Sequence, residues 1–178
     1  MSYITTYTGK DFDPLNPRSE LVDIRDIAHA LSLLCRANGH FVSFYSVGQH
    51  CINCALEAKA RGYAMRLQLA CLLHDAAEAY MADVTRPVKQ MLEEYTTAED
   101  RLLKVIYRKF LPEMLSAEEM QAVKAIDDDL LLFEFSRLMK RDVFDRTAEL
   151  MSQPQTGFVP FAEIEEKYIE MFYKLGGQ

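Results

Sequence analysis

The chain has 178 residues, of which 49% are hydrophobic and 26% charged, and its formal net charge is −7. This length predicts one domain over residues 1–178, with enough buried surface to fold without disulfides or a structural metal. The negative charge argues against a nucleic-acid polymer as partner, because such binding depends on cationic surfaces.

The sequence also excludes a membrane span, since no apolar run approaches the ~20 residues that one requires. The N-terminus lacks the basic start and apolar core of a secretory signal peptide. Together with four scattered cysteines, this predicts reduced thiols in a cytoplasmic protein.

The predicted elements are mostly helical. Residues 1–20 are rich in turn formers and predict an arm or a short hairpin packed on the domain. Amphipathic helices are expected over residues 23–35 and, from a capping box at Ser46 and Gln49, to about residue 60. The run from 65 to 81 is apolar nearly all round and predicts one central, buried helix, followed by a loop over 82–88.

Further helices are expected over residues 98–111, from a second capping box at Ser116 and Glu119 to about residue 140, and over about 162–175. The predicted fold class is therefore all-α, with about six or seven helices and at most a small β element near residues 3–13.

The predicted central helix carries His74, Asp75 and Glu78 within five residues. Burying a carboxylate costs several kcal/mol unless it is paired or bound to a metal. His74 and Glu78 are four residues apart and would share a helix face, while the adjacent Asp75 lies about 100° away. An adjacent histidine and aspartate can converge on one ion, so this cluster predicts a metal site.

Two further ligands are expected from other helices. In the run 127–129, helical phase places Asp127 on the side of the apolar positions, whereas Asp128 and Asp129 face elsewhere. His50 lies one turn inside a capped helix start, from which it can point into the bundle. His50, His74, Asp75 and Asp127 would form a site with two histidines and two carboxylates, which suits Mn, Co, Fe or Zn.

Other polar and thiol residues are ambiguous. Cys51 and Cys54 form a CxxC, but without a second CxxC they are better interpreted as small buried residues. Glu134 lies near Asp127 in helical phase, and a salt-bridging or ligand-supporting role is about as plausible as none.

The order H…HD…D resembles the HD-domain metal-dependent phosphohydrolases. The motifs that carry the resemblance are FYSVGQH, LLHDAAEAYMADVTRPVK and VKAIDDDLLLFE, and it covers about the first 135 residues. The chain is similar to small bacterial and prophage hydrolases of deoxynucleotides, including 5′-monophosphatases and dATP triphosphohydrolases. It departs from the usual pattern at Gly48 and Ala37, where alanine and an aromatic residue are typical.

The resemblance implies an HD-domain bundle with one divalent ion, Mn, Co, Zn, Fe or Mg, held by the four ligands above, and a homo-oligomer. It implies catalytic roles for Glu78, in orienting water or moving a proton, and for Asp83, in protonating the leaving oxygen. It also implies phosphate contacts from Arg36 and Lys89, and His40 is a further candidate for binding substrate.

The expected reaction is hydrolysis of a deoxynucleotide phosphate by water that the ion activates. A monophosphate would yield nucleoside and phosphate, and a triphosphate would yield nucleoside and triphosphate. One alternative is a degenerate HD module that binds nucleotide or metal without catalysis. Another is a cyclic-nucleotide phosphodiesterase, which usually needs two metals and more than the four histidines present.

Overall fold

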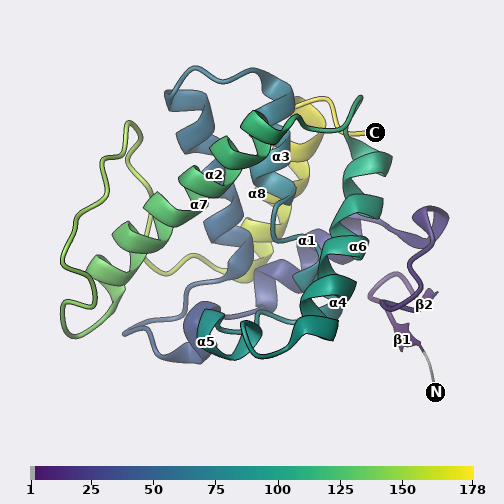
Figure 1. Cartoon of the computed structure of the whole chain (residues 1–178), viewed down its shortest axis with the longest axis horizontal. Coiled ribbons are helices and arrows are strands. Elements are labelled where there is room, and N and C mark those ends of the chain that lie inside the picture. The colour runs from purple at the N-terminus through teal and green to yellow at the C-terminus, as the bar shows by residue number, and fades with distance from the viewer. Residues whose placement is uncertain (1–2) are drawn as a thin grey trace.

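A computed structural model describes residues 3–178, and it confirms the all-α prediction. The described elements follow one another along the chain as Figure 1 shows. The longer helices are α1 (Ile24–Leu33), α2 (Val47–Ala60), α3 (Met65–Leu73), α6 (Glu93–Phe110), α7 (Ala117–Leu138) and α8 (Phe161–Lys174). Short elements are α4 (Glu78–Met81), α5 (Arg86–Lys89) and the 3₁₀ turns η1 (Ser19–Leu21) and η2 (Arg36–Gly39).

The N-terminal segment is the expected hairpin, in which β1 (Ile4–Thr5) pairs antiparallel with β2 (Asp11–Phe12). Phe12 is fully buried and stacks on Tyr80, with ring centroids 4.2 Å apart. The hairpin turn is also fastened to α1, because Thr8 donates from its main-chain nitrogen and its hydroxyl to Asp26. Residues 1 and 2 of the predicted arm lie outside the described part of the chain.

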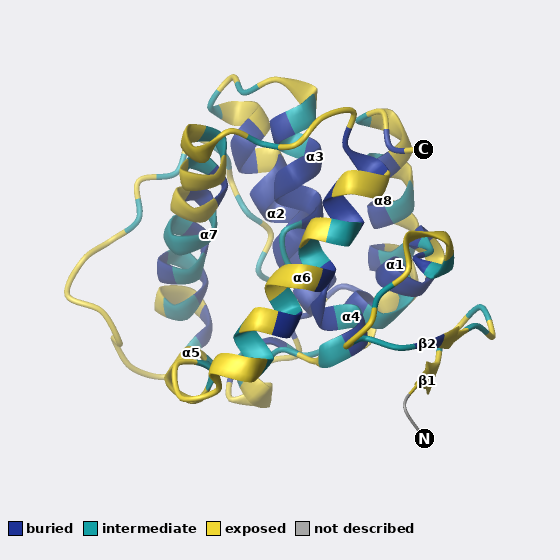
Figure 2. Cartoon of the chain, turned by 45° about the vertical axis from the view of Figure 1, so that its right-hand side comes forward, coloured by how far each residue is buried: buried dark blue, intermediate teal, exposed yellow. Residues whose placement is uncertain are grey.

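Helix α2 lies at the centre of the bundle. Eleven of its 14 residues are buried, and Figure 2 shows it almost entirely in the colour of buried residues. It packs against α1, α3, α7 and α8. Gly48 permits a close approach there, since a Cβ would lie 3.0 Å from Ile164 Cγ2 and 3.2 Å from the Leu31 carbonyl group.

The prediction of one continuous helix from 65 to 81 is wrong. Helix α3 ends at Leu73, residues 74–77 form turns, and α4 begins at Glu78. Through the break the main chain uses bonds from residue i to i−3, such as Ala76 N–H to the Leu73 carbonyl. The Cys71 carbonyl, the normal partner of the residue 75 amide in an α-helix, accepts from the His74 ring instead. The interruption therefore coincides with the predicted metal ligands, and the shared helix face assumed for His74 and Glu78 does not apply.

Other boundaries differ for local reasons. Ser46 caps α2 by accepting from the Gln49 amide, but the Gln49 side chain does not complete a capping box, because it bonds to carbonyls of residues 155 and 157. Helix α6 begins five residues before the expected 98, with acidic residues in its first turn, where the helix dipole favours them. The second capping box, at Ser116 and Glu119, is present as predicted.

Within residues 3–178, no helix combines the length and apolar character needed to cross a membrane.

Candidate metal centre

Four side chains from three parts of the fold converge at the inner side of α2. His50 comes from α2, His74 and Asp75 from the break after α3, and Asp127 from α7. His50 Nε2 lies 3.3 Å from His74 Nε2, 3.1 Å from Asp127 Oδ1 and 3.8 Å from Asp75 Oδ2. His74 Nε2 lies 3.2 Å from Asp75 Oδ1 and 3.7 Å from Asp127 Oδ1. All four predicted ligands are therefore brought together.

The hydrogen bonds on the far side of each imidazole assign its tautomer. His50 Nδ1 lies 2.6 Å from Glu134 Oε1, and His74 Nδ1 lies 2.8 Å from the Cys71 carbonyl oxygen. A carboxylate and a carbonyl can only accept, so each Nδ1 must donate. In the neutral rings both Nε2 atoms then present lone pairs to the same point, where two carboxylates also present theirs.

This donor set fits a divalent cation. Ligand atoms about 2.1 Å from a common ion are about 3.0–3.4 Å apart in octahedral or tetrahedral geometry, and the contacts above fall between 3.1 and 3.8 Å. Two imidazoles and two carboxylates balance the charge of such an ion. The structure thus contains side-chain clusters that could hold a metal.

Without an ion, the close contacts among these side chains shift their pKa values. Burial and Arg36 lower the pKa of His50, but Cys54, Glu134 and Asp127 outweigh them and leave it well above its usual value. Burial raises the pKa of Asp127, but hydrogen bonds from both histidines leave it well below its usual value. A bound cation and protons on the imidazoles therefore compete for the same lone pairs.

Two thiols adjoin the cluster. Cys54 Sγ lies 3.5 Å from His50 Nε2, and Cys51 groups with His74 and Asp75 as a set of potential ligand atoms. Both thiols are buried, as expected for small core residues, but their contact with the histidines was not predicted. Burial raises the pKa of Cys51, so it remains a thiol and is a weaker ligand than the carboxylates.

The three consecutive aspartates on α7 point in different directions. Asp127 faces the histidines, whereas Asp128 pairs with Arg86 at 2.6 Å and with Lys124, and Asp129 pairs with Arg61 at 2.8 Å. The helical phase inferred from the sequence therefore selects the same inward-facing carboxylate, Asp127, as the structure shows.

Glu134 is the centre of a chain of hydrogen bonds and ion pairs behind His50. It is fully buried and accepts from the Tyr45 hydroxyl at 2.7 Å as well as from His50, and its other oxygen lies 3.2 Å from Arg36 Nε. Burial raises the pKa of Glu134, but His50 and Arg36 outweigh it and keep the pKa below its usual value. Arg36 continues the chain to Asp75, with Nη1 3.3 Å from Oδ2.

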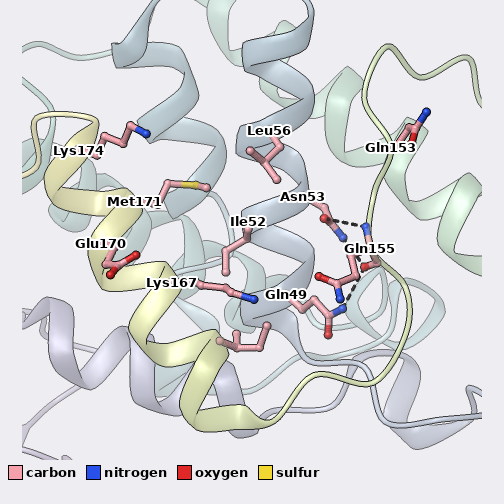
Figure 3. A pocket seen from close by; sticks show the side chains of 11 residues that line it. Gln49, Ile52, Asn53, Leu56, Gln153, Gln155, Lys167, Glu170, Met171 and Lys174 are labelled. Atoms are coloured by element: carbon pink, nitrogen blue, oxygen red, sulfur yellow. Dashed lines mark hydrogen bonds between the residues drawn. The ribbon is translucent and has the colours of Figure 1, made fainter.

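The chain also extends to the irregular segment before α8. Asn53 donates to the Tyr45 hydroxyl at 2.8 Å and to the Gln155 carbonyl at 3.0 Å, and Gln49 donates to the same carbonyl. Figure 3 shows Asn53 and Gln49 of α2 reaching Gln155 at the edge of a separate cleft of about 430 Å³. Gln49 and Asn53 thus hold the segment around Gln155, which leads into α8, against α2.

A cavity of about 560 Å³ opens on the predicted ligands Asp75 and Asp127. Glu78 and Asp83 also line it. Burial, Asp75 and Asp83 raise the pKa of Glu78, and its Oε2 is buried without a hydrogen-bond partner. Burial likewise raises the pKa of Asp83. Both carboxyl groups therefore face the cavity with a weakened tendency to ionise.

The residues predicted to contact the substrate, Arg36, Lys89 and His40, line the same cavity but differ in how firmly neighbouring side chains hold them. Arg36 is buried and bonded to two carboxylates, so it is fixed in place. Lys89 pairs with Glu99 at 2.8 Å and lies 3.7 Å from Glu78. His40, the further candidate for binding substrate, is an exposed residue at the cavity rim.

Arg86 was not predicted from the sequence. Its guanidinium lies at the cavity, 3.0 Å from Asp127 Oδ2, while its side chain remains half exposed. It stands in a four-residue helix next to Pro87, and no periodic pattern could have indicated its direction.

Ala82 separates the two candidate catalytic carboxyl groups and has an unusual backbone, with φ 82° and ψ 156°. This region is essentially restricted to glycine and costs about 1–3 kcal/mol for another residue. The conformation is held by the Ala82 amide, which donates to the Glu78 carbonyl, and by the Tyr95 hydroxyl, which donates to the Ala82 carbonyl at 2.7 Å. Directly after it the chain turns Asp83 toward the cavity.

Comparisons with known proteins give relatives without an assigned role. The chain is 40% identical over 119 residues to the uncharacterized protein YfdR of Escherichia coli strain K12. It is 37% identical over 126 residues to an uncharacterized protein of Rhodobacter capsulatus. These alignments cover 65% and 67% of this chain, and it spans 63% and 64% of the length of these curated relatives. No family model matches the chain.

Proposed function

We propose that this protein is a metal-dependent phosphohydrolase of deoxynucleotides, with one divalent ion held by His50, His74, Asp75 and Asp127. The observation that carries the proposal is the convergence of four lone-pair donors whose imidazoles already donate on their other side. Such an arrangement is electrostatically unfavourable unless a cation, or protons in its place, lies between the donors.

A bound divalent ion would polarise a phosphoryl oxygen and make water a stronger nucleophile at neutral pH. Glu78 is suited to orient that water and take its proton, because its unpartnered Oε2 lies in the cavity wall and its raised pKa makes it a stronger base. Asp83, whose pKa burial also raises, is suited to donate a proton to the leaving oxygen.

The charges lining the cavity support an anionic substrate only when a cation is present. Four carboxyl groups line it together with three arginine and lysine side chains, so the bare wall has no excess of positive charge when Asp75 and Asp127 and at least one of the other two carboxyl groups are ionised. A divalent ion reverses this balance. The cationic members are Arg36, Arg86 and Lys89. Arg36 can offer a phosphate the N–H groups that Glu134 and Asp75 do not engage, and Lys89 can offer a point charge.

The cavity size suits a small molecule rather than a polymer.

All four cysteines, which lie within the described residues, are free thiols. This supports a cytoplasmic location, because unpaired thiols are usual in reducing compartments.

The test is a product analysis on the full chain, stripped with a chelator and reloaded with Mn, Co, Mg or Zn. Deoxynucleoside monophosphates and triphosphates are offered, and chromatography identifies nucleoside with phosphate or with triphosphate. We expect turnover only in the reloaded protein, and the released product decides between the two substrate classes.

Undiminished turnover in the stripped protein would overturn the proposed chemistry. Binding of the ion without turnover of any nucleotide would favour the non-catalytic module. A preference for 3′,5′-cyclic nucleotides would favour the phosphodiesterase alternative.

A further inference from the structure

The cavity at the metal centre has two unlike sides. Part of the lining is charged and includes Asp75 and Asp127, and part of it is apolar. The apolar side, here called the α7 wall, consists of Leu131, Phe135, Met139 and Phe144. None of these side chains carries a hydrogen-bond donor, and their only acceptor is the weak one of the Met139 sulfur, so they offer little with which to recognise the edge of a base.

The α7 wall begins next to a metal ligand and runs away from it. Asp127, Leu131 and Phe135 follow one another at four-residue intervals on α7, which forms a continuous ridge on a helix, and Met139 is the residue that follows its C-terminal end. With a rise of 1.5 Å per residue, each step moves about 6 Å along α7. Phe135 is thus about 12 Å along α7 from Asp127, and the ring of Phe144 lies beside that of Phe135. Both rings are therefore farther from the predicted ligands than a phosphate held there, at a distance that an organic group attached to the phosphate could reach.

The aromatic rings of the wall are held in place by neighbouring rings. Phe135 contacts Phe41 edge to face, with centroids 5.1 Å apart, and Phe144 at 5.7 Å. Phe135 is only partly buried, and Phe144 is 40% exposed. The wall is therefore an ordered apolar surface left open to solvent inside a charged cavity, which is typical of a ligand-binding surface.

We propose that the α7 wall binds the nucleobase of the substrate by its face, with the phosphate at the metal centre. This inference rests on the proposed function and names the part of the substrate that the apolar side accepts. Because the wall contacts the face of the base, its contribution is the same for different bases, and any discrimination among them must come from other lining residues.

The inference is tested by comparing ligands with and without a base on the metal-loaded full chain. The probes are dAMP, dGMP and dTMP, against 2-deoxyribose 5-phosphate and inorganic phosphate. Calorimetry gives each dissociation constant, and KM is added where turnover occurs. In Phe135→Ala and Phe144→Ala we expect all three nucleotides to bind about tenfold more weakly, the loss typical of one aromatic stacking partner. The two base-free probes should bind as in the wild type.

The matched control is Phe133→Ala. Phe133 is on the same helix and is also partly buried, but its ring lies against Arg137 and is not part of the cavity lining. This variant should keep the preference for nucleotides over 2-deoxyribose 5-phosphate. Phe144→Ala guards against misfolding as an explanation, because its side chain lies outside the core.

The outcomes separate this inference from the proposed function. Unchanged nucleotide affinity in both variants, a loss confined to one base, or an equal loss for inorganic phosphate would overturn the role of the α7 wall. Failure of the metal-loaded wild type to bind dAMP would overturn it as well. Nucleotide binding that depends on the wall, without hydrolysis under any metal, would instead refute the phosphohydrolase and leave the binding surface established.

Discussion

Replacing Glu134 by glutamine is expected to weaken metal binding although Glu134 does not contact the ion position. The carboxylate accepts from His50 Nδ1 at 2.6 Å and from the Tyr45 hydroxyl at 2.7 Å, and it lies 3.2 Å from Arg36 Nε. These contacts use both oxygens. They also fix the His50 tautomer whose Nε2 lone pair faces the other ligands.

An amide cannot reproduce this arrangement. The side chain of the Glu134→Gln variant would have one accepting oxygen. If that oxygen faced His50 and Tyr45, the NH₂ group would face Arg36; in the opposite orientation the NH₂ group would face both His50 Nδ1 and Tyr45. In either case Arg36 would lose one of its two counter-charges. Groups that orient a metal-bound histidine are worth about 10–100-fold in metal affinity. We therefore expect the dissociation constant for Mn or Co to rise by about that factor, while the protein remains folded.

The assay is competition with a chelating indicator, combined with ¹⁵N NMR of the histidine side chains to determine the tautomer of His50. Glu57→Gln is the matched control. Like Glu134, Glu57 is fully buried, but it lies on α2 and accepts from Arg61 and residues 151 and 152, away from the predicted ligands. That variant should lose stability but not metal affinity. Wild-type metal affinity and an unchanged His50 tautomer in folded Glu134→Gln would refute the reasoning.

The packing and charges lead to three further predictions. Asp127→Asn should weaken metal binding by at least about 100-fold, because the loss of a ligand should exceed the loss of a supporting group. Asp128→Asn should leave the metal affinity unchanged. Equal losses in a chelator titration would show that the two carboxylates are misassigned. Gly48→Ala should cost about 1–3 kcal/mol in urea unfolding through overpacking. Ile164→Leu should partly rescue it, because the new Cβ would lie 3.0 Å from Ile164 Cγ2 and leucine lacks that methyl group; no rescue would contradict the contact. Burial raises the pKa of Glu78 above its unfolded value of about 4.3. The ionised carboxylate therefore destabilises the folded state once the pH exceeds the unfolded value. Metal-free Glu78→Gln should melt at a higher temperature than the wild type near pH 8 but not near pH 4. A gain independent of pH would speak against this origin.

The sequence was most informative where a helix is regular. Helix α7 has its predicted capping box and runs without interruption, so counting residues at 100° each was enough to select Asp127 from three neighbouring aspartates. The same count placed Glu134 near Asp127, but only the structure shows that it bonds to His50 and Tyr45.

The failures occurred where tertiary contacts replaced local ones. Nothing in the apolar run around His74 indicates that its ring takes the Cys71 carbonyl and interrupts the helix. Gln49 matched a capping box, but its side chain bonds to a segment more than 100 residues away. Arg86 could not be placed, because a single helical turn beside a proline gives no phase.

The backbone at Ala82 gives this protein an unusual route to greater thermal resistance. Ala82→Gly would relieve a conformation that an alanine tolerates poorly, so selection for heat tolerance alone would readily accept it. The same change would loosen the pivot that directs Asp83, and the gain in melting temperature would come with a less well-aimed carboxyl group. A selection of variants of this chain for heat tolerance should therefore find position 82 among the first at which the melting temperature rises while the proposed hydrolysis becomes slower.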